Sequence, residues 1–323
     1  MFFSRNRSLK FIAVLFSISF IYLSNSVSAF SRNPIPLPTK AKKIIKKKKP
    51  SAVNRPRVSI ITSIFKGDEF IKGFLADIVQ QSIFKHCELI LINANSPGKE
   101  ESIIKQYVPR YPNIRYIKLG KDPGLYGVWN VGIKMALSDF ITNANLDDRR
   151  NPRSLEIEAK ALEQNPSVDL VYGDFLCTKR ANETFKHHTA KTIVKHPDFQ
   201  LCYMSSCLPG PQPMWRKSMH TKYGLFDEKF LSCGDWEMWC RAVSKGSRFK
   251  KIPNFVTGLY YYNPAGLSTD EAKLEIRTME YNLIVKTYRY LWAKPQQPTK
   301  GIASEGYSYH EILHHRYFAI PLD

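Results

Sequence analysis

Two adjacent carboxylates, Asp147 and Asp148, lie in the stretch NANLDDRRNP at residues 143–152 and are the first candidates for chemistry. Carboxylate oxygens are ligands that Mg²⁺ and Mn²⁺ prefer, and these ions keep substrate phosphates and water as their other ligands. The pair therefore predicts a site for a divalent cation beside a phosphorylated substrate. The alternative is that Asp148 and the polar residues after it cap a helix that begins near residue 153.

A third acid, Asp235, stands between Gly234 and Trp236 in the stretch GDWEMWCR. Aromatic neighbours would partly desolvate its carboxylate and raise its pKa, which suits a general base. The alternative is again structural, because Asp235 also precedes a helical pattern and could be its N-cap. Both interpretations hold together if the residue caps a helix at the mouth of a loop.

Alternating strands and helices must position these acids. Continuous apolar runs of strand length predict buried strands, and apolar residues at helical spacing predict the helices between them. The expected strands cover residues 58–65, 87–96, 114–119, 139–145 and 168–175, and the expected helices cover residues 67–84, 99–111, 125–137, 152–164 and 270–292. From about residue 176 the pattern changes to longer loops, fewer strands and many aromatic residues.

This alternation predicts an α/β fold with a mostly parallel central sheet and helices on both faces. In such open sheets, ligands bind outside the carboxyl ends of the strands. Residues 93–96 and 145–148 both follow expected strands, so the acidic pair falls where this architecture places an active site.

The order of the segments VSIITSIFKGDEFI, ELILINANS, DPGLYGVWNVGIKMALSDFITNANLDD and GLFDEKFLSCGDWEMWCRA resembles that of family 2 glycosyltransferases, which have the GT-A fold. The resemblance runs from about residue 58 to residue 290. It implies transfer of a sugar from a nucleotide-diphosphate donor to an acceptor hydroxyl of a glycan or a lipid-linked glycoconjugate, with Mn²⁺ or Mg²⁺ as cofactor. It also divides the domain at 58–292 into a nucleotide-sugar half, 58–175, and an acceptor half, 176–292.

The resemblance also implies which residues form the site, because positions in this sequence match the motifs of the family. Asn145, Leu146 and Asp147 match the DxD motif, whose acids bind the metal on the donor diphosphate, with Asp148 beside it. Residues that match the nucleotide and donor-sugar pocket are Ser63, Phe65, Asn93, Asn95, Asp122, Gly124, Tyr126 and Asn130. Asp235 matches the acidic motif that supplies the catalytic base of an inverting transfer.

Two aromatic residues of the acceptor half, Trp215 and Trp236, are expected to stack on sugar rings, because aromatic faces suit the apolar faces of sugars. Trp239, four residues after Asp235, is instead expected in the core.

Two positions depart from the family pattern. Asn145 and Ala94 stand where the family often has aspartates. An amide oxygen carries no charge, so a weaker metal site is expected, and Ala94 removes a usual contact to the nucleotide base. The alternative function is therefore a catalytically silent nucleotide- or sugar-binding protein of the same fold.

The stretch HEILHH at residues 310–315 spells the HExxH motif of zinc proteases, with His310 and His314 as ligands. The extended motif requires a glycine and a further histidine downstream, but Tyr317 and Ile320 stand there. Because the extended motif is incomplete, a metallopeptidase ranks third among the hypotheses, after the transferase and the silent binding protein.

The N-terminal part, residues 1–30, combines basic residues with the apolar run FIAVLFSISFIYL at 11–23. It predicts a signal peptide cleaved near Ala29, with export of the domain, or a single-pass membrane anchor. Residues 31–57 form a Pro- and Lys-rich linker, and residues 293–323 form a C-terminal tail.

The formal net charge is +20, and seven lysines without an acid lie at residues 40–49. This tract lacks interleaved aromatic residues and a nucleic-acid-binding fold beside it, so it predicts docking on acidic lipid and no nucleic-acid partner.

Six cysteines leave the redox compartment open. Four of them fall close together in the acceptor half and could form disulfides in an exported domain, or all could be free thiols.

Overall fold

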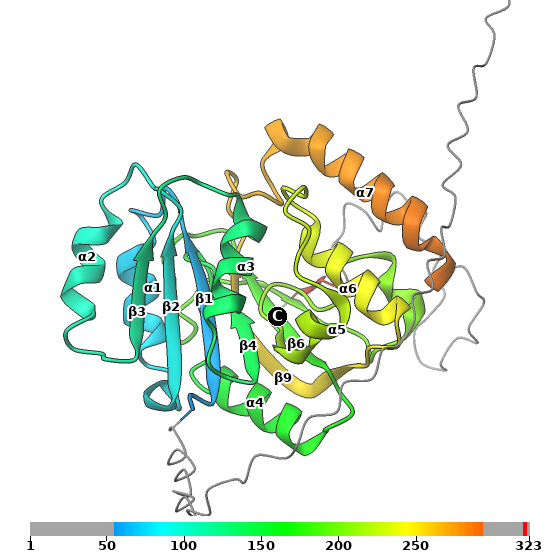
Figure 1. Cartoon of the computed structure of the whole chain (residues 1–323), viewed down its shortest axis with the longest axis horizontal. Helices are drawn as coiled ribbons and strands as arrows, with labels where there is room; N and C mark the ends of the chain where they lie inside the picture. The colour runs from blue at the N-terminus through cyan, green and yellow to red at the C-terminus, as the bar shows by residue number, and fades with distance from the viewer. Residues whose placement is uncertain (1–54, 293–318, 322–323) are drawn as a thin grey trace, which may run out of the picture. The chain divides into compact units, whose positions relative to one another are not determined.

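The computed structural model of the chain describes residues 55–292 and, as backbone, residues 319–321 (Figure 1). The predicted membrane segment, most of the linker with its lysine tract, and the HExxH stretch lie outside the described residues. Within them, no helix is long and apolar enough to cross a membrane.

The first half of the domain alternates strands and helices as predicted. Its elements are β1 (Val58–Ile64), α1 (Ile71–Ile78), η1 (Phe84–His86), β2 (Cys87–Asn93), α2 (Glu100–Tyr107), β3 (Ile114–Lys118), α3 (Leu125–Met135), β4 (Phe140–Asn143), β5 (Arg149–Arg150), α4 (Ser154–Gln164) and β6 (Leu170–Thr178).

The second half contains β7 (Thr192–Val194), η2 (Leu201–Ser205), β8 (Met214–Arg216), α5 (Ser218–Tyr223), α6 (Gly234–Ser244), β9 (Phe249–Tyr261), η3 (Glu271–Lys273), α7 (Leu274–Tyr288), η4 (Arg289–Leu291) and β10 (Ala319–Pro321). Helix α7 lies beside α6 (Figure 1). The strand β10 pairs with β7, so part of the predicted tail joins the sheet.

The described strands form one sheet in the order β10-β7-β6-β8-β4-β1-β2-β3, with β9 pairing β5 and β6. Strands β3, β2, β1 and β4 are parallel, which confirms the predicted parallel sheet. Strands β7, β8 and β10 add antiparallel pairs, and β9 runs parallel to β6.

The long strand β9 was missed by the prediction of few strands after residue 176. Its sequence contains Lys250, Lys251 and Pro253, and Asn254 has a positive φ of 51°. The register to β6 shifts around Asp174. The first half of this bulged strand has no continuous apolar run, so the strand pattern is absent there. The second half, FVTGLYY at residues 255–261, is rich in strand-forming residues, a signal that the prediction of few strands did not use.

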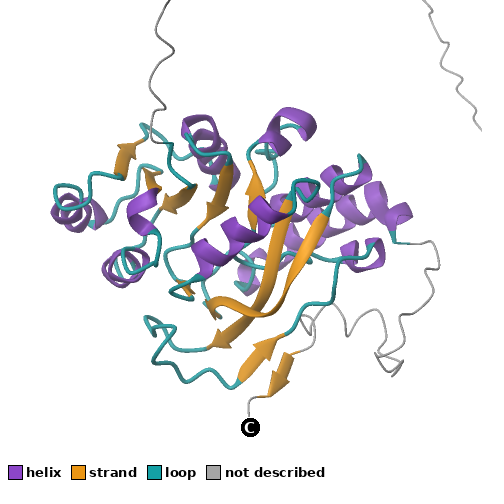
Figure 2. Ribbon diagram, turned by 90° about the horizontal axis from the view of Figure 1, so that it is seen from below, coloured by secondary structure: helices purple, strands orange, loops and turns teal. Residues whose placement is uncertain are grey.

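The buried strands carry apolar side chains on both faces because each face packs against helices. On β1, Ile60 and Ile64 join the core cluster under α1, α2 and α4, whereas Ile61 joins the cluster under α3 and α6. Seen from below, the strands run between the helices (Figure 2). The two-sided cover explains the unbroken apolar runs from which these strands were predicted.

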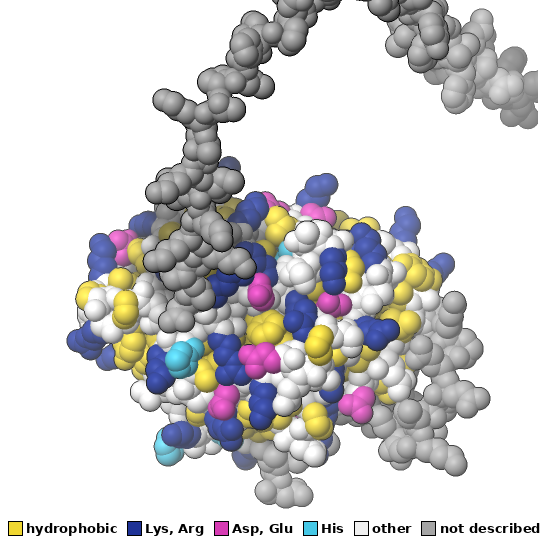
Figure 3. All heavy atoms as spheres, turned by 60° about the horizontal axis from the view of Figure 1, so that its bottom comes forward, with side chains coloured by type: hydrophobic (Ala, Val, Ile, Leu, Met, Phe, Trp, Pro, Cys, Tyr) yellow, Lys and Arg dark blue, Asp and Glu magenta, His cyan; other side chains and the backbone are white. Residues whose placement is uncertain are grey.

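Charged side chains of both signs are interspersed over the face at the bottom of Figure 1 (Figure 3). A groove of about 340 Å³ lies between α4 and the start of β9 and is lined by Arg153, Lys160 and Lys250 among others. None of the residues that line it is one of the predicted site residues.

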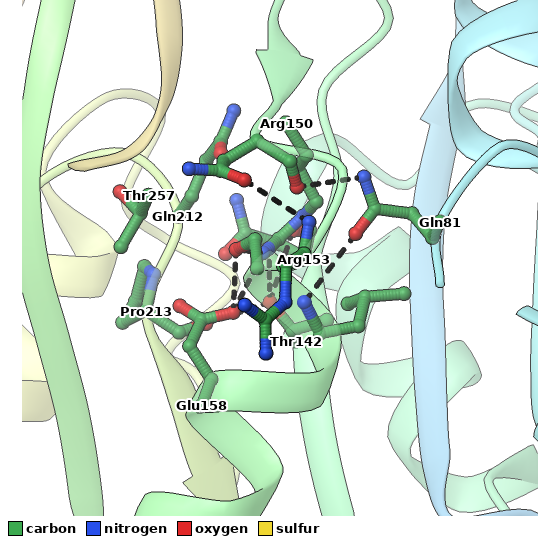
Figure 4. A network of polar contacts seen from close by, with 12 residues as sticks. Gln81, Thr142, Arg150, Arg153, Glu158, Gln212, Pro213 and Thr257 are labelled. Carbon is green, nitrogen blue, oxygen red and sulfur yellow. Dashed lines mark hydrogen bonds and ion pairs between the residues drawn. The ribbon is translucent and has the colours of Figure 1, made fainter. Parts of the chain in front are cut away.

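A buried ion pair fixes the chain directly after the acidic pair (Figure 4). The guanidinium of Arg150, 2% exposed, lies 2.8 Å from the carboxylate of Glu158, which is inaccessible to solvent. The same guanidinium donates to Thr142 and to the carbonyl of Asn143 at the end of β4. These contacts hold β4, β5 and α4 together below the site.

We expect Glu158→Gln to lower the free energy of unfolding by about 3 kcal/mol, because it leaves the Arg150 charge buried without a counter-ion. Urea unfolding measures this at pH 8, since burial raises the pKa of Glu158 to about 7 and the carboxylate must be ionised. The matched control is Glu156→Gln, which removes an exposed partner of Arg153 and should cost less than about 1 kcal/mol. Equal losses in the two variants would contradict the structural role of the buried pair.

Candidate active site

The turn after β4 carries Asp148, whose carboxylate points into the protein. Its Oδ1 accepts the backbone N–H of Tyr261 at 3.0 Å, and its Oδ2 accepts the side-chain amide of Asn145 at 3.1 Å. The residue is 3% exposed. Burial, followed by the neighbouring Asp147, raises the pKa of Asp148 to about 8. Asp148 therefore fastens the turn to the end of β9.

Asp147 is oriented differently and is half-buried. Its Oδ2 accepts the side-chain amide of Asn263 at 3.0 Å, and its Oδ1 has no hydrogen bond within the described residues. A divalent cation that keeps phosphate oxygens and water needs few protein ligands. Although the described residues contain no cluster of three or more His, Cys, Asp or Glu side chains suited to a metal, Asp147 fits as a single carboxylate ligand. Both oxygens of Asp148 already accept hydrogen bonds from the protein, and the metal site at Asp147 and Asp148 stays a prediction.

The hydrogen bonding of the turn explains why residue 145 is an asparagine. Its amide is the donor that Asp148 Oδ2 accepts. A carboxylate at residue 145 would offer no donor to Asp148 and would repel the charge of Asp147. The departure from the family pattern is therefore matched by the hydrogen bonding of this turn.

The loops after β1 and β2 lie at the same sheet edge and are tied together. Ser96 Oγ accepts the Lys66 N–H at 2.9 Å, and Asn93 Oδ1 accepts the Ser96 N–H at 2.7 Å. The buried Glu100 accepts the Gly67 N–H at 2.6 Å through Oε1. Beside this framework Phe65 is 43% exposed, and Asn95 is exposed with a φ of 56°.

The predicted donor-sugar residues around the start of α3 differ in whether their side chains are exposed or buried. Asp122 is exposed, and its Oδ1 accepts the N–H of Gly124, which precedes the helix with a φ of 79°. Asn130 is buried, and its amide oxygen and nitrogen both bond to the main chain of Phe226, with a further bond to Glu228. The side chain of Asn130 therefore joins α3 to the acceptor half rather than pointing to a ligand.

Asp235 lies in the first turn of α6, which begins at Gly234, so it is not the N-cap of the helix. Its Oδ1 accepts the hydroxyl of Tyr126 at 3.2 Å and the N–H of Trp236 at 2.9 Å. Its Oδ2 accepts the thiol of Cys207 at 3.5 Å. Burial raises the pKa of this half-buried carboxyl. A partly accessible carboxylate with a raised pKa can take a proton from a hydroxyl.

The turn before Asp235 is held by an acid from another helix. Glu280 on α7 is 8% exposed, and its carboxylate accepts the backbone N–H groups of Leu231, Ser232 and Cys233 at 2.5, 3.0 and 2.8 Å. Helix α6 has no side-chain cap of its own. Glu280 therefore satisfies the N–H groups that approach the start of the helix.

Two chain segments connect the acidic turn to Asp235. The carbonyl of Pro211 accepts the amide of Asn143 at 3.0 Å, and the same segment contains Cys207, which contacts Asp235. On the other side, Ser232 Oγ donates to the carbonyl of Leu267 at 3.0 Å, in the loop that also contains Asn263. These contacts link the segments that carry Asp147 and Asp235.

The prediction that Trp215 and Trp236 stack on sugars is wrong for this structure. Trp215 is 1% exposed and Trp236 is 4% exposed. Their ring N–H groups bond to His220 and to the carbonyl of Met204. Both rings pack among other aromatic side chains, as Trp239 does. The many aromatic residues of the acceptor half fill a core instead of forming a sugar platform.

Comparison with known proteins identifies the family. The model of "Glycosyl transferase family 2" matches residues 59–224. The chain belongs to glycosyl transferase family 2.

Among the similar proteins are uncharacterized glycosyltransferases. YwdF of Bacillus subtilis is 24% identical over 262 residues, which cover 77% of this chain and 94% of that protein. MJ1057 of Methanocaldococcus jannaschii is 23% identical over 205 residues, which cover 63% of this chain and 70% of that protein. These names support a transferase.

The same fold occurs in solved glycosyltransferases. Residues 1–349 of S. aureus TarS in complex with UDP-GlcNAc match with a TM-score of 0.57 and 16% identity, over 73% of this chain and 70% of that chain. The mannosyltransferase PcManGT of Pyrobaculum calidifontis, in complex with GDP-Man and Mn²⁺, matches with a TM-score of 0.54 and 16% identity, over 76% and 66%. They confirm the predicted GT-A fold of this family 2 member.

Three residues of the region were not predicted as site residues: Cys207, Asn263 and Glu280. Glu280 and Asn263 come from segments far along the chain from the residues they contact. Cys207 is one of the four clustered cysteines, for which the sequence left a disulfide or a free thiol open. All six cysteines lie in the described part of the chain, and none of them forms a disulfide bond.

We expect Glu280→Ala to destabilise this glycosyltransferase by about 3 kcal/mol, because three N–H groups lose their acceptor in a part-buried setting. Urea unfolding measures the loss. Glu275→Ala on the exposed face of the same helix is the control and should change stability by less than about 0.5 kcal/mol. A Glu280→Ala variant as stable as this control would contradict the capping role.

Proposed function

We propose that the protein is an inverting glycosyltransferase that transfers a sugar from a nucleotide-diphosphate donor to a hydroxyl of a glycan or lipid-linked acceptor. The observation that carries the proposal is the half-buried Asp235 carboxylate, which has a raised pKa and accepts the Tyr126 hydroxyl. Hydrogen bonds from neighbouring segments link it to the turn that carries Asp147. Family membership and the nucleotide sugars bound by structural neighbours support the donor class.

In the proposed reaction Asp235 takes the proton of the acceptor hydroxyl as its oxygen attacks the anomeric carbon. The bond between this carbon and the diphosphate oxygen breaks, and its electron pair leaves with the nucleotide diphosphate. Attack opposite to the leaving group inverts the anomeric centre. Tyr126 and the N–H of Trp236 orient the carboxylate by donating to its Oδ1.

We propose Asp147 as the protein ligand for Mn²⁺ or Mg²⁺. When bound, the metal would neutralise charge on the departing diphosphate. Asn263 orients the Asp147 carboxylate, and Asp148 with Asn145 keeps the turn in place. The framework of Asn93, Ser96 and Glu100 would form the floor beside the nucleotide, with Ser63, Phe65 and Asn95 at its edge.

We also propose that the protein works at a membrane. The support comes from the sequence, in which the apolar run at residues 11–23 precedes the lysine tract at residues 40–49. A tether of this kind would place the domain near a lipid-linked acceptor.

We expect Asp235→Asn to lower kcat by roughly 10²- to 10⁴-fold, because the amide cannot accept the acceptor proton. The measurement is release of nucleotide diphosphate from a nucleotide sugar that the protein turns over. Donor affinity should stay unchanged, and the exposed Asp227→Asn variant should keep wild-type turnover. Wild-type turnover in Asp235→Asn would refute the base assignment.

The metal role is tested by thermal unfolding with UDP-GlcNAc and GDP-Man, each with and without Mn²⁺. A donor that binds the folded state raises the midpoint temperature, and we expect the rise to require Mn²⁺. Asp147→Ala should lose the Mn²⁺-dependent part of the rise, whereas Asp139→Ala, at an exposed position 83% accessible in its side chain, should retain it. A rise that chelator and Asp147→Ala leave intact would contradict the metal role. If a donor binds but is never turned over, the silent binding protein is the correct alternative.

A further inference from the structure

The two oxygens of the Asp235 carboxylate are hydrogen-bonded unequally. Oδ1 accepts two donors, the Tyr126 hydroxyl and the Trp236 N–H. Oδ2 accepts one, the Cys207 thiol at 3.5 Å. A carboxylate oxygen has two lone-pair sites. Oδ1 is therefore filled by protein donors, whereas Oδ2 has one site left.

The donor on Oδ2 is also the weakest of the three, because a thiol is a poor hydrogen-bond donor. Oδ2 accordingly keeps more of its basicity than Oδ1. Burial, followed by the nearby Asp235 charge, raises the pKa of Cys207 well above its ordinary value, so the thiol stays protonated and continues to donate.

Burial raises the pKa of Asp235, and the hydrogen bonds from these donors oppose that rise. The titratable groups that face it are Tyr126 from α3, Cys207 from the segment after η2 and Cys233 from the turn before α6. Glu280 from α7 lies one step farther away, on the N–H of Cys233. Among the described residues, no Lys or Arg forms an ion pair with Asp235.

We propose that Oδ2 of Asp235 is the atom that receives the acceptor proton, and that Cys207 is a positioning residue that directs this oxygen and tunes its basicity. The inference rests on the proposed function, in which Asp235 is the base. In the step, the acceptor O–H bond breaks and its proton binds the free lone pair of Oδ2. The acceptor oxygen bonds to the anomeric carbon as the bond from that carbon to the diphosphate oxygen breaks, and the electron pair leaves with the nucleotide diphosphate. The thiol proton stays on Cys207, so the residue directs the base without being consumed.

The test is the pH dependence of kcat/KM for donor turnover by the full chain. A base must be ionised, so the rate falls on the acid side with the apparent pKa of Asp235. Cys207→Ala removes a donor that favours the carboxylate, and its acid limb should move to higher pH by about half a unit. Cys207→Ser replaces the thiol with a stronger donor, and its limb should lie at or below that of the wild type.

Cys202→Ala is the matched control, because this half-buried thiol contacts Gln200 and not Asp235; its limb should coincide with the wild-type limb. An acid limb that Cys207→Ala leaves in place would overturn the inference. If Cys207→Ala does not fold, the serine variant decides, and a limb shifted to higher pH by serine would overturn it. An active Asp235→Asn variant would instead overturn the proposed base itself, so the two failures are distinguishable.

Discussion

The hydrogen bond between the Asp148 carboxylate and the Tyr261 N–H joins sequence positions 113 residues apart at the site. Because Asp148 is buried, its oxygens must find donors inside the protein, and Tyr261 and Asn145 supply them. This requirement fixes the acidic turn against the end of β9. Asn263, two residues beyond Tyr261, can then reach Asp147. A buried carboxylate thus orients the neighbouring, more accessible one.

In the acceptor half, too, buried side chains form hydrogen bonds that fix loops in place. Glu280 satisfies the backbone N–H groups before α6, and Asn130 satisfies the main chain at Phe226. Both side chains hold loops in place without contacting substrate in our proposal. The rigidity they provide matters because a general base must stay within hydrogen-bond distance of the reacting hydroxyl.

The sequence was sufficient for the parallel strands and for the acidic turn at the end of β4, because two-sided burial leaves unbroken apolar runs. It was insufficient for the start of β9, where Lys250, Lys251 and Pro253 interrupt the apolar pattern. It was also insufficient for the role of Glu280, because the sequence does not show which backbone N–H groups a distant carboxylate will bind. Trp215 and Trp236 were misassigned because an aromatic residue suits a sugar face and a core equally well. From the sequence, Asn145 stands where the family pattern often has a metal-binding aspartate. In the structure its amide donates to Asp148.

The anomeric configuration of the sugar released from the donor tests the central claim most directly. With water as acceptor, proton NMR during early hydrolysis of an α-linked nucleotide sugar in the presence of Mn²⁺ reports which anomer forms first. A single base at Asp235 that activates the attacking hydroxyl predicts the β-anomer, which then mutarotates. First formation of the α-anomer would contradict an inverting transfer at this site.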